Sequence, residues 1–292
     1  MRNFIIIFSG KEGTSPLVRL LNNLEKISIL HHVNNRGWEP FDRHNCGRMS
    51  LKDLRTCLDI IYQEGEIDYH ALNKIYTKTA AHPIDEVDYT GIIGFKMRFV
   101  SPARFISVKR WQIFKRIYGN YHFKIFKKMM INILRRHNVV VFMVVRQDIF
   151  RWGLSKYHGD GTGKSGHLQF KLASGKLSRD KIGKVFVDPE KLNRIISDRE
   201  ALHAAKRRLL IEFKKNGIQT YPLLYEDFLN DRKLVVKYIA KCLEMDLTEA
   251  EIDCALQKGE YYKKVHSDDI SEFVENHEEI KNKFGDRYIS WR

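Results

Sequence analysis

Four residues close to the start of the sequence could together bind a phosphate group. They are Lys11, Gly13, Thr14 and Ser15. The apolar run before them, Phe4–Phe8, predicts a buried strand, and the leucines after them recur at helical spacing. Where a strand passes through a glycine loop into a helix, backbone N–H groups and the positive helix end converge on an anion. An ordinary strand-to-helix turn without a ligand has the same pattern and stays an alternative.

The position at which the helix begins decides which groups of this loop face an anion. Ser15 is a good N-cap residue, and Pro16 fits the first helical position, where its missing N–H costs nothing. Glu12 brings a carboxylate beside the phosphate pocket, so we expect its side chain to point away. The loop lacks the Gly-Lys-Ser/Thr ending of a Walker A nucleotide loop.

A second group of candidate residues follows the most hydrophobic strand that the sequence predicts, residues 139–145. Arg146 ends this strand, and Ser155 lies on the helix expected after it. A planar guanidinium and a hydroxyl can hold a terminal phosphate.

Three signals, in family order along the chain, resemble sulfotransferases. The loop that begins at Lys11 is similar to their 5′-phosphosulfate loop, usually Lys/Arg-Ser-Gly-Thr-Thr/Ser, from which Glu12 departs. The spacing of Arg146 and Ser155 is similar to that in bacterial carbohydrate sulfotransferases of the trehalose-sulfating type. The segment Tyr225–Asp227 resembles the family's Tyr-Glu-Asp-Leu, and there we favour strand-end capping and core anchoring over catalysis.

The resemblance implies an enzyme that moves a sulfuryl group from 3′-phosphoadenosine 5′-phosphosulfate (PAPS) to a hydroxyl acceptor, in line and without a metal. By analogy alone, the acceptor is a carbohydrate. The donor-binding residues that it implies are Lys11, Gly13, Thr14 and Ser15 on the 5′ side, and Arg146 and Ser155 on the 3′ side. Lys11 would also act on charge that develops at the bridging oxygen. A basic segment near the C-terminus often closes over the nucleotide in this family, which adds Lys263 and Lys264 as candidates.

The reaction needs a base for the acceptor proton and cations for the charge on the leaving phosphate. The resemblance implies Glu39 as the base, and His32 and His82 stay alternatives. Lys96 resembles a catalytic lysine that the family places on a strand near the sulfate. Arg98 stands where cytosolic relatives carry a catalytic histidine, and an always-protonated arginine cannot be a base.

The order of expected elements predicts one α/β domain over residues 1–292, with a P-loop-like three-layer fold and a central, mostly parallel sheet flanked by helices. Strands are expected at 4–8, 27–33, 91–99, 139–145 and 218–223. After the first helix, further helices are expected near 50–62, 69–79, 147–157, 188–216, 232–243, 248–257 and 271–284. A helical or loop insertion is expected around 158–187, and a helical C-terminal part from about residue 231.

The chain carries a formal net charge of +15, which favours anionic partners but does not choose among them. Residues 109–136 are basic and aromatic, and their pattern predicts a solvated basic face around a core stripe. The Gly-rich segment 158–165 lacks the first Walker A glycine and predicts a mobile loop or a lid. A P-loop kinase-like transferase and a basic nucleic-acid-binding protein are the competing functions.

Four widely spaced cysteines indicate reduced thiols in a cytoplasmic protein instead of a disulfide framework. They are Cys46, Cys57, Cys242 and Cys254. No apolar run approaches the roughly 18 residues that a membrane span needs. We therefore expect a cytoplasmic enzyme with a small-molecule or glycan acceptor, no specific nucleic acid partner, no metal and a possible homodimer.

Overall fold

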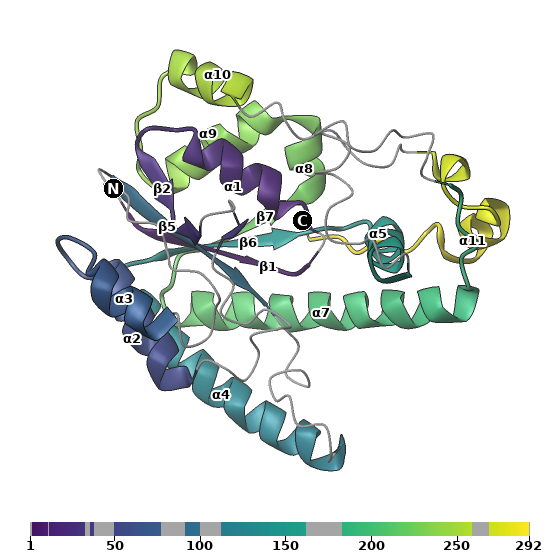
Figure 1. The fold of residues 1–292 in the computed structure, drawn as a ribbon, viewed down its shortest axis with the longest axis horizontal. Helices are drawn as coiled ribbons and strands as arrows, with labels where there is room; N and C mark the ends of the chain where they lie inside the picture. Colours follow the sequence, from purple (N-terminus) through teal and green to yellow (C-terminus); the bar gives the residue numbers. More distant parts are fainter. Residues whose placement is uncertain are drawn as a thin grey trace.

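The fold is seen in a computed structural model, which describes residues 2–10, 12–32, 36–37, 50–76, 91–99, 112–161, 183–258 and 269–291. A parallel sheet of five strands lies at its centre, in the order β2-β5-β1-β6-β7 (Figure 1). These strands are β1 (Phe4–Phe8), β2 (Ile27–Ile29), β5 (Ile92–Arg98), β6 (Val140–Val145) and β7 (Thr220–Leu224). The predicted α/β fold with a central parallel sheet is confirmed.

Strand β1 occupies the middle of the sheet because it is apolar on both faces. All five of its residues are buried, as are all six residues of β6 beside it. Such continuous apolar runs suit strands that helices cover on both sides. In the register of the sheet, Ile6 of β1 lies between Lys96 of β5 and Phe142 of β6.

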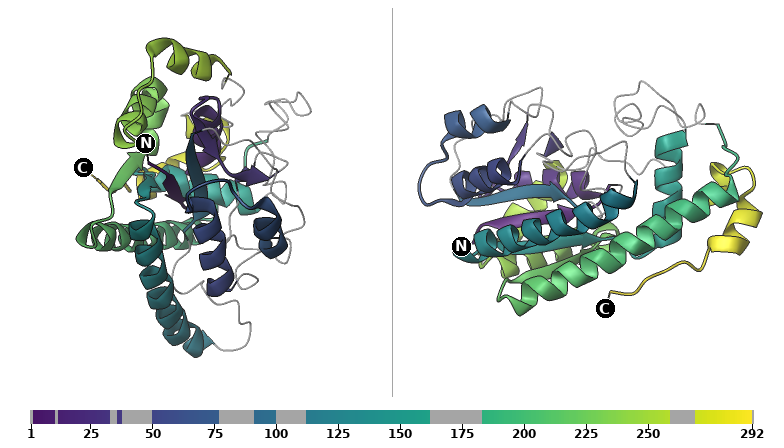
Figure 2. Two further views of the ribbon diagram at one scale, coloured as in Figure 1. Left: turned by 90° about the vertical axis from the view of Figure 1, so that its left-hand side faces the viewer. Right: turned by 90° about the horizontal axis from the view of Figure 1, so that it is seen from below.

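Helices pack on both faces of the sheet and form two separate hydrophobic cores (Figures 1 and 2). One core involves α1 (Thr14–Asn22), α8 (Tyr225–Asn230), α9 (Arg232–Cys242) and α10 (Glu249–Lys258). The other involves α2 (Leu51–Tyr62), α3 (Tyr69–Tyr76), α4 (Gln112–Arg136), α5 (Ile149–Gly161), α7 (Pro189–Lys215) and α11 (His277–Phe284). The sheet with a helical layer on each face makes the three layers.

Two predicted elements have other boundaries than expected: one strand ends earlier, and one helix begins later. The second strand stops at Ile29, because the chain then forms a small antiparallel pair of β3 (His31–His32) and β4 (Arg36–Gly37). The last helix begins at His277 and not near Ser271. A short 3₁₀ helix occupies Ile270–Glu272, and an isolated bridge between Val274 and Val185 interrupts the helical path.

Two observations bear on the composition of the chain. Cys57, Cys242 and Cys254 are free thiols, and Cys46 lies outside the described residues. None of the helices in the described ranges is long and apolar enough to span a bilayer.

Helix α5 continues to Gly161, so the first four residues of the predicted Gly-rich loop are helical, and the rest of that loop lies outside the described residues.

Candidate functional site

The strand order marks one place at the edge of the sheet where a ligand can enter. The chain after β1 first builds β2 and β5 on one side of it, and then crosses to β6 and β7 on the other side. In open α/β sheets, ligands bind beyond the carboxyl ends of the strands where the order changes direction. Here that place lies between the segments that follow Phe8 and Val145, which are the predicted phosphate loop and Arg146.

The loop after β1 leads directly into α1, and its geometry depends on Gly13. This residue is the N-cap of α1 and has a φ of 70°, in the left-handed region that glycine enters without strain. A Cβ on Gly13 would also collide with the ring of Tyr225. Glycine is therefore required here both by the backbone conformation and by the close approach of an aromatic ring.

The prediction that Ser15 caps this helix is wrong, because Gly13 turns the chain into helix two residues earlier. Thr14 is the first helical residue and is buried, whereas Ser15 is exposed. Among the described residues, no side chain caps the α1 N-terminus, and its first turn carries no acidic residue. The positive end of α1 is thus not neutralised by a side chain of its own first turn.

Glu12, the residue that departs from the sulfotransferase pattern, forms a buried ion pair with Lys206 of α7. The Lys206 Nζ lies 2.7 Å and 2.6 Å from the two carboxylate oxygens, and both side chains are fully buried. The Ser9 backbone N–H donates to the same carboxylate. Lys206 also donates to the carbonyl of Val144, at 2.8 Å. The Lys206 ammonium therefore joins the loop to the carboxyl end of the neighbouring strand, β6.

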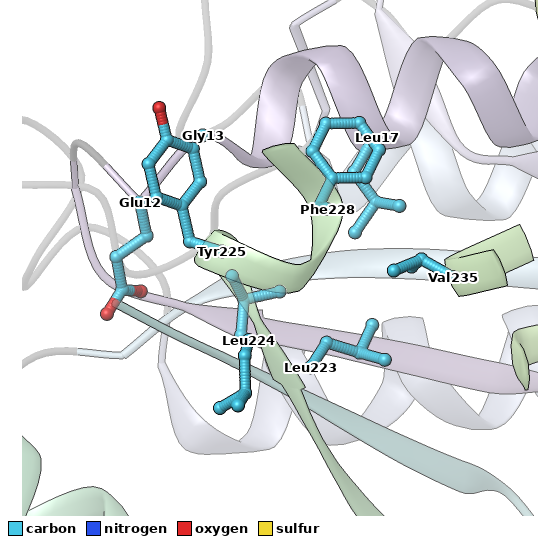
Figure 3. A pocket seen from close by; sticks show the side chains of 9 residues that line it. Glu12, Gly13, Leu17, Leu223, Leu224, Tyr225, Phe228 and Val235 are labelled. Carbon is cyan, nitrogen blue, oxygen red and sulfur yellow. The ribbon is translucent and has the colours of Figure 1, made fainter. Parts of the chain in front are cut away.

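The position of Glu12 confirms that its carboxylate turns away from Gly13 and the start of α1 (Figure 3). Burial raises the pKa of Glu12, and the Lys206 charge opposes this rise. Burial likewise lowers the pKa of Lys206, against the effect of Glu12. Each partner thus offsets part of the desolvation of the other.

Arg146 follows β6, and side chains of α8 contact it and the two residues after it. Its guanidinium lies 4.8 Å from the centroid of the Tyr225 ring, the ring that also contacts Gly13. The carboxylate of Glu226 accepts the backbone N–H groups of Gln147 and Asp148, at 3.0 Å and 3.1 Å. The prediction that Tyr225–Asp227 caps a strand end is therefore confirmed for Glu226. Tyr225 in addition lies between the loop and Arg146.

The carbonyl of Arg146 is bound from the other face of the sheet, by His203 of α7. The His203 Nε2 lies 2.7 Å from this oxygen, and the Trp291 indole N–H donates to the His203 Nδ1 at 2.5 Å. Burial is the main cause that lowers the pKa of His203 to about 3, and the nearby Lys206 charge lowers it further. The ring is therefore neutral at physiological pH.

The sequence analysis missed the contribution of α7, although a signal for it exists. Seven positions, spaced four and three residues apart, form one buried stripe along this helix: Leu192, Ile196, Arg199, His203, Lys206, Leu210 and Phe213. The three central positions are basic or titratable, and they are as buried as the apolar ones. Charged residues in an apolar helical stripe indicate buried polar partners.

Trp152 of α5 connects this stripe to the loop. Its ring is fully buried, and its indole N–H donates to the Gly10 carbonyl at 2.8 Å. The Arg199 guanidinium lies 4.8 Å from the centroid of the same ring. Helix α7 thus supports both segments of the candidate site from behind.

Lys96 lies on the other side of β1, on β5. It is buried, and its Nζ lies 4.5 Å from the centroid of the Phe8 ring. Ser155 is half-buried on α5, and its predicted role with Arg146 stays a prediction. The other predicted residues, Lys11, Glu39, His82, Lys263 and Lys264, lie outside the described residues, as does the side chain of His32.

A small apolar cavity lies behind Gly13, between α1 and α8 (Figure 3). Its lining includes Leu17, Leu223, Phe228 and Val235. Its volume of about 10 Å³ is at the lower limit for one water molecule. A nucleotide cannot enter it, so this cavity is not the candidate site. Within the described ranges, no group of three histidine, cysteine or acidic side chains could hold a metal ion.

Comparison with solved structures finds sulfotransferases over most of the chain. A sulfotransferase from Alicyclobacillus acidocaldarius is 15% identical, with a TM-score of 0.43, over 98% of this chain and 92% of that one. Sulfotransferase STF9 from Mycobacterium avium is 10% identical, with a TM-score of 0.44, over 97% and 75%. Mouse sulfotransferase SULT7A1, complexed with PAP, is 11% identical, with a TM-score of 0.39, over 88% and 64%.

These likenesses are weak in both identity and TM-score. No protein-family model matches the sequence. No curated protein matches it either.

Proposed function

We propose that this chain is a PAPS-dependent sulfotransferase. The observation that carries the proposal is the contact of Tyr225 with both Gly13 and Arg146. Through this ring, the glycine loop and the arginine meet at the carboxyl edge of the sheet, where the strand order changes direction. Two anion-binding elements on neighbouring strands suit a nucleotide with phosphate groups at both its 5′ and 3′ positions.

The described residues fit such a donor. The N-terminus of α1 has no acidic residue in its first turn and no capping side chain from the part of the chain that the structure describes, so its N–H groups suit the 5′ phosphosulfate. The guanidinium of Arg146 suits the 3′-phosphate, because arginine binds phosphate through paired N–H groups. The acidic residue of the loop, Glu12, is neutralised by Lys206 and faces away.

In this proposal, the residues of the chain divide the work of sulfuryl transfer. Lys11 and Lys96 stabilise the charge that develops on the transferred group and on the leaving phosphate. Glu39 takes the proton from the acceptor hydroxyl, with His32 and His82 as alternatives. Ser15 and Ser155 add hydroxyl donors on the 5′ and 3′ sides. We further propose a carbohydrate acceptor, as in the trehalose-sulfating relatives that the spacing of Arg146 and Ser155 resembles.

Calorimetry with three nucleotides tests the proposal. The protein should bind 3′-phosphoadenosine 5′-phosphate (PAP) more tightly than adenosine 5′-phosphate (AMP) by about two orders of magnitude, because charge-assisted hydrogen bonds to the 3′-phosphate are lost in AMP. Arg146→Ala should erase this preference. Lys164→Ala, in the Walker-like segment, is the matched control and should leave it intact.

Two outcomes would overturn the proposal. One is equal affinity for PAP, AMP and ATP. The other is tightest binding to magnesium ATP, which would favour a kinase-like transferase. A screen for sulfation of sugars, lipids and phenols with PAPS would then identify the acceptor.

A further inference from the structure

The segment Arg287–Trp291 returns from α11 to the edge of the sheet and lies against the residues that follow β6 (Figure 1). The backbone N–H of Ile149 donates to the Arg287 carbonyl, and the N–H of Ile289 donates to the Gln147 carbonyl, both at 3.0 Å. The Gln147 side chain also donates to the Tyr288 hydroxyl. The last described residues of the chain therefore contact the strand end that carries Arg146.

Trp291 is the residue of this segment that connects to Arg146 through a side chain. An indole N–H can only donate, so the His203 Nδ1, 2.5 Å away, must be the acceptor. The single proton of the neutral imidazole then lies on Nε2, which donates to the Arg146 carbonyl at 2.7 Å. Trp291 thus selects the histidine tautomer that can bind this carbonyl.

Side chains from the described part of the chain bind the peptide that carries Arg146 and the residues after it. His203 binds its carbonyl, Glu226 binds the two following N–H groups, and Tyr225 packs on the guanidinium. Among these side chains, His203 is the one to which the end of the chain donates a side-chain hydrogen bond. His203 is 2% exposed and Trp152 packs edge-on against its ring, at 5.3 Å between centroids, which leaves it little freedom to turn.

We propose that Trp291 and His203 are positioning residues for the 3′-phosphate arginine. The hydrogen bond from Trp291 fixes the His203 tautomer, and His203 fixes the peptide from which Arg146 reaches the donor. The inference rests on the proposed function, since it assumes that Arg146 binds a 3′-phosphate. It assigns to the C-terminal segment a part in donor selectivity, beyond its packing on the fold.

The test measures the ratio of PAP to AMP affinity by calorimetry in three proteins. Trp291→Phe keeps an aromatic ring against His203 and removes the indole N–H together with the five-membered part of the ring. Its PAP-to-AMP ratio should fall about threefold to tenfold, which corresponds to one hydrogen bond. Arg207→Met is the matched control, because Arg207 holds the same segment through the Ser290 carbonyl and the Trp291 ring but does not contact Arg146. Its ratio should stay at the wild-type value.

A second readout follows the tautomer itself. The ¹⁵N chemical shifts of His203 should show the proton on Nε2 in the wild type, and a mixture of both tautomers in Trp291→Phe. A merely structural role for Trp291 would lower the melting temperature without moving either the tautomer or the ratio.

The outcomes separate this inference from the proposed function. A wild-type protein without any preference for PAP over AMP overturns the proposed function, whatever the variants do. A wild-type preference that Trp291→Phe leaves unchanged overturns the positioning role alone. Equal losses in Trp291→Phe and Arg207→Met also overturn it, because the segment would then act through its general attachment to α7.

Discussion

At the scale of single residues, positive side chains from the strands on both sides of β1 lie near the predicted phosphate loop. Lys96 and Arg98 of β5 lie over the Phe8 ring, at 4.5 Å and 5.7 Å from its centroid. On the other side, Arg146 extends from the end of β6 and lies over Tyr225. An anion bound by the loop after Phe8 would therefore meet cations from both neighbouring strands, which is what a doubly phosphorylated donor requires.

The proposed base gives the prediction that belongs to this scale. Glu39→Gln removes the proton acceptor and keeps the size of the side chain. Turnover should fall by about two to four orders of magnitude, as is usual when a general base is lost. The affinity for PAP, measured by calorimetry, should change little and serves as the control. Near-normal turnover in this variant would transfer the role to His32 or His82.

At the scale of elements, α7 joins three parts of the molecule through its buried basic stripe. Lys206 contacts the loop through Glu12 and contacts β6 through Val144. His203 contacts the end of the same strand, and Arg199 packs on Trp152 of α5. A buried ammonium is expensive unless it is paired and hydrogen-bonded, and here all of its partners come from other elements. The stripe therefore fixes the distance between the loop and the strand end.

Because Glu12 and Lys206 form a buried ion pair, we expect their substitutions to have coupled effects on the free energy of unfolding. Glu12→Gln or Lys206→Met alone leaves a buried charge without its partner, and should lower the free energy of unfolding by about 3–5 kcal/mol. The double variant should lose clearly less than the sum of the two single losses. Urea denaturation of the four proteins measures the coupling.

The matched control for this cycle is Asp253→Asn. It removes the carboxylate of a solvent-exposed pair, in which the Lys233 Nζ lies 2.6 Å from Asp253. The unfolding midpoint of this variant should stay close to the wild-type value, because exposed pairs contribute little. Additive losses in the Glu12–Lys206 cycle would contradict the role assigned to the buried pair.

The sequence was sufficient to predict the strands of the sheet, for a physical reason. A strand covered on both faces must be apolar throughout, so Phe4–Phe8 and Val140–Val145 are recognisable without any partner. Helix starts were harder to predict. Ser15 has the side chain of a good cap, but the left-handed conformation of Gly13 begins α1 earlier, and the ring of Tyr225, which is distant in the sequence, leaves no room for a Cβ there.

From the sequence one can name the glycine loop and Arg146, which the structure brings together through Tyr225, but not the residues that support them. Gly13 and Arg146 stand out by their types and positions, whereas Lys206 and His203 resemble ordinary polar residues of a long helix. Lys206 is separated from Glu12 by 194 positions in the sequence. No local pattern reports such a pairing. A charged residue inside an apolar stripe would have indicated that α7 has a buried partner, but not which one.

At the scale of the whole molecule, the C-terminal segment and α7 close the candidate site from behind. The segment 287–291 contacts both α7 and the residues after β6 (Figure 2). Its packing helps to bury His203, and this burial lowers the pKa of the imidazole and keeps it neutral. The stability of the protein should therefore depend on the protonation of this residue.

The pH dependence of unfolding tests this conclusion. The pKa of His203 is about 3 in the folded protein and near 6.5 in an unfolded chain, so between these values only the unfolded state binds the proton. The stability that the neutral ring contributes is complete above about pH 6.5 and is lost as pH falls toward 3. The free energy of unfolding of the wild type should fall more steeply than that of His203→Gln, by roughly 1 kcal/mol per pH unit. Equal slopes between pH 6 and 4.5 would show that the ring is protonated in the folded state.

The position of β1 in the middle of the sheet also governs how the protein can be made. Its neighbours, β5 and β6, begin only at Ile92 and Val140. During synthesis, the uncharged run Phe4–Phe8 has no sheet neighbour until β5 has been made. It lacks its second neighbour until the ribosome has passed Val145. Distant parallel pairings form slowly, and an exposed apolar strand of this kind promotes aggregation meanwhile. The yield of active protein should therefore depend on chaperone capacity and on the speed of translation, even for variants whose folded state is fully stable.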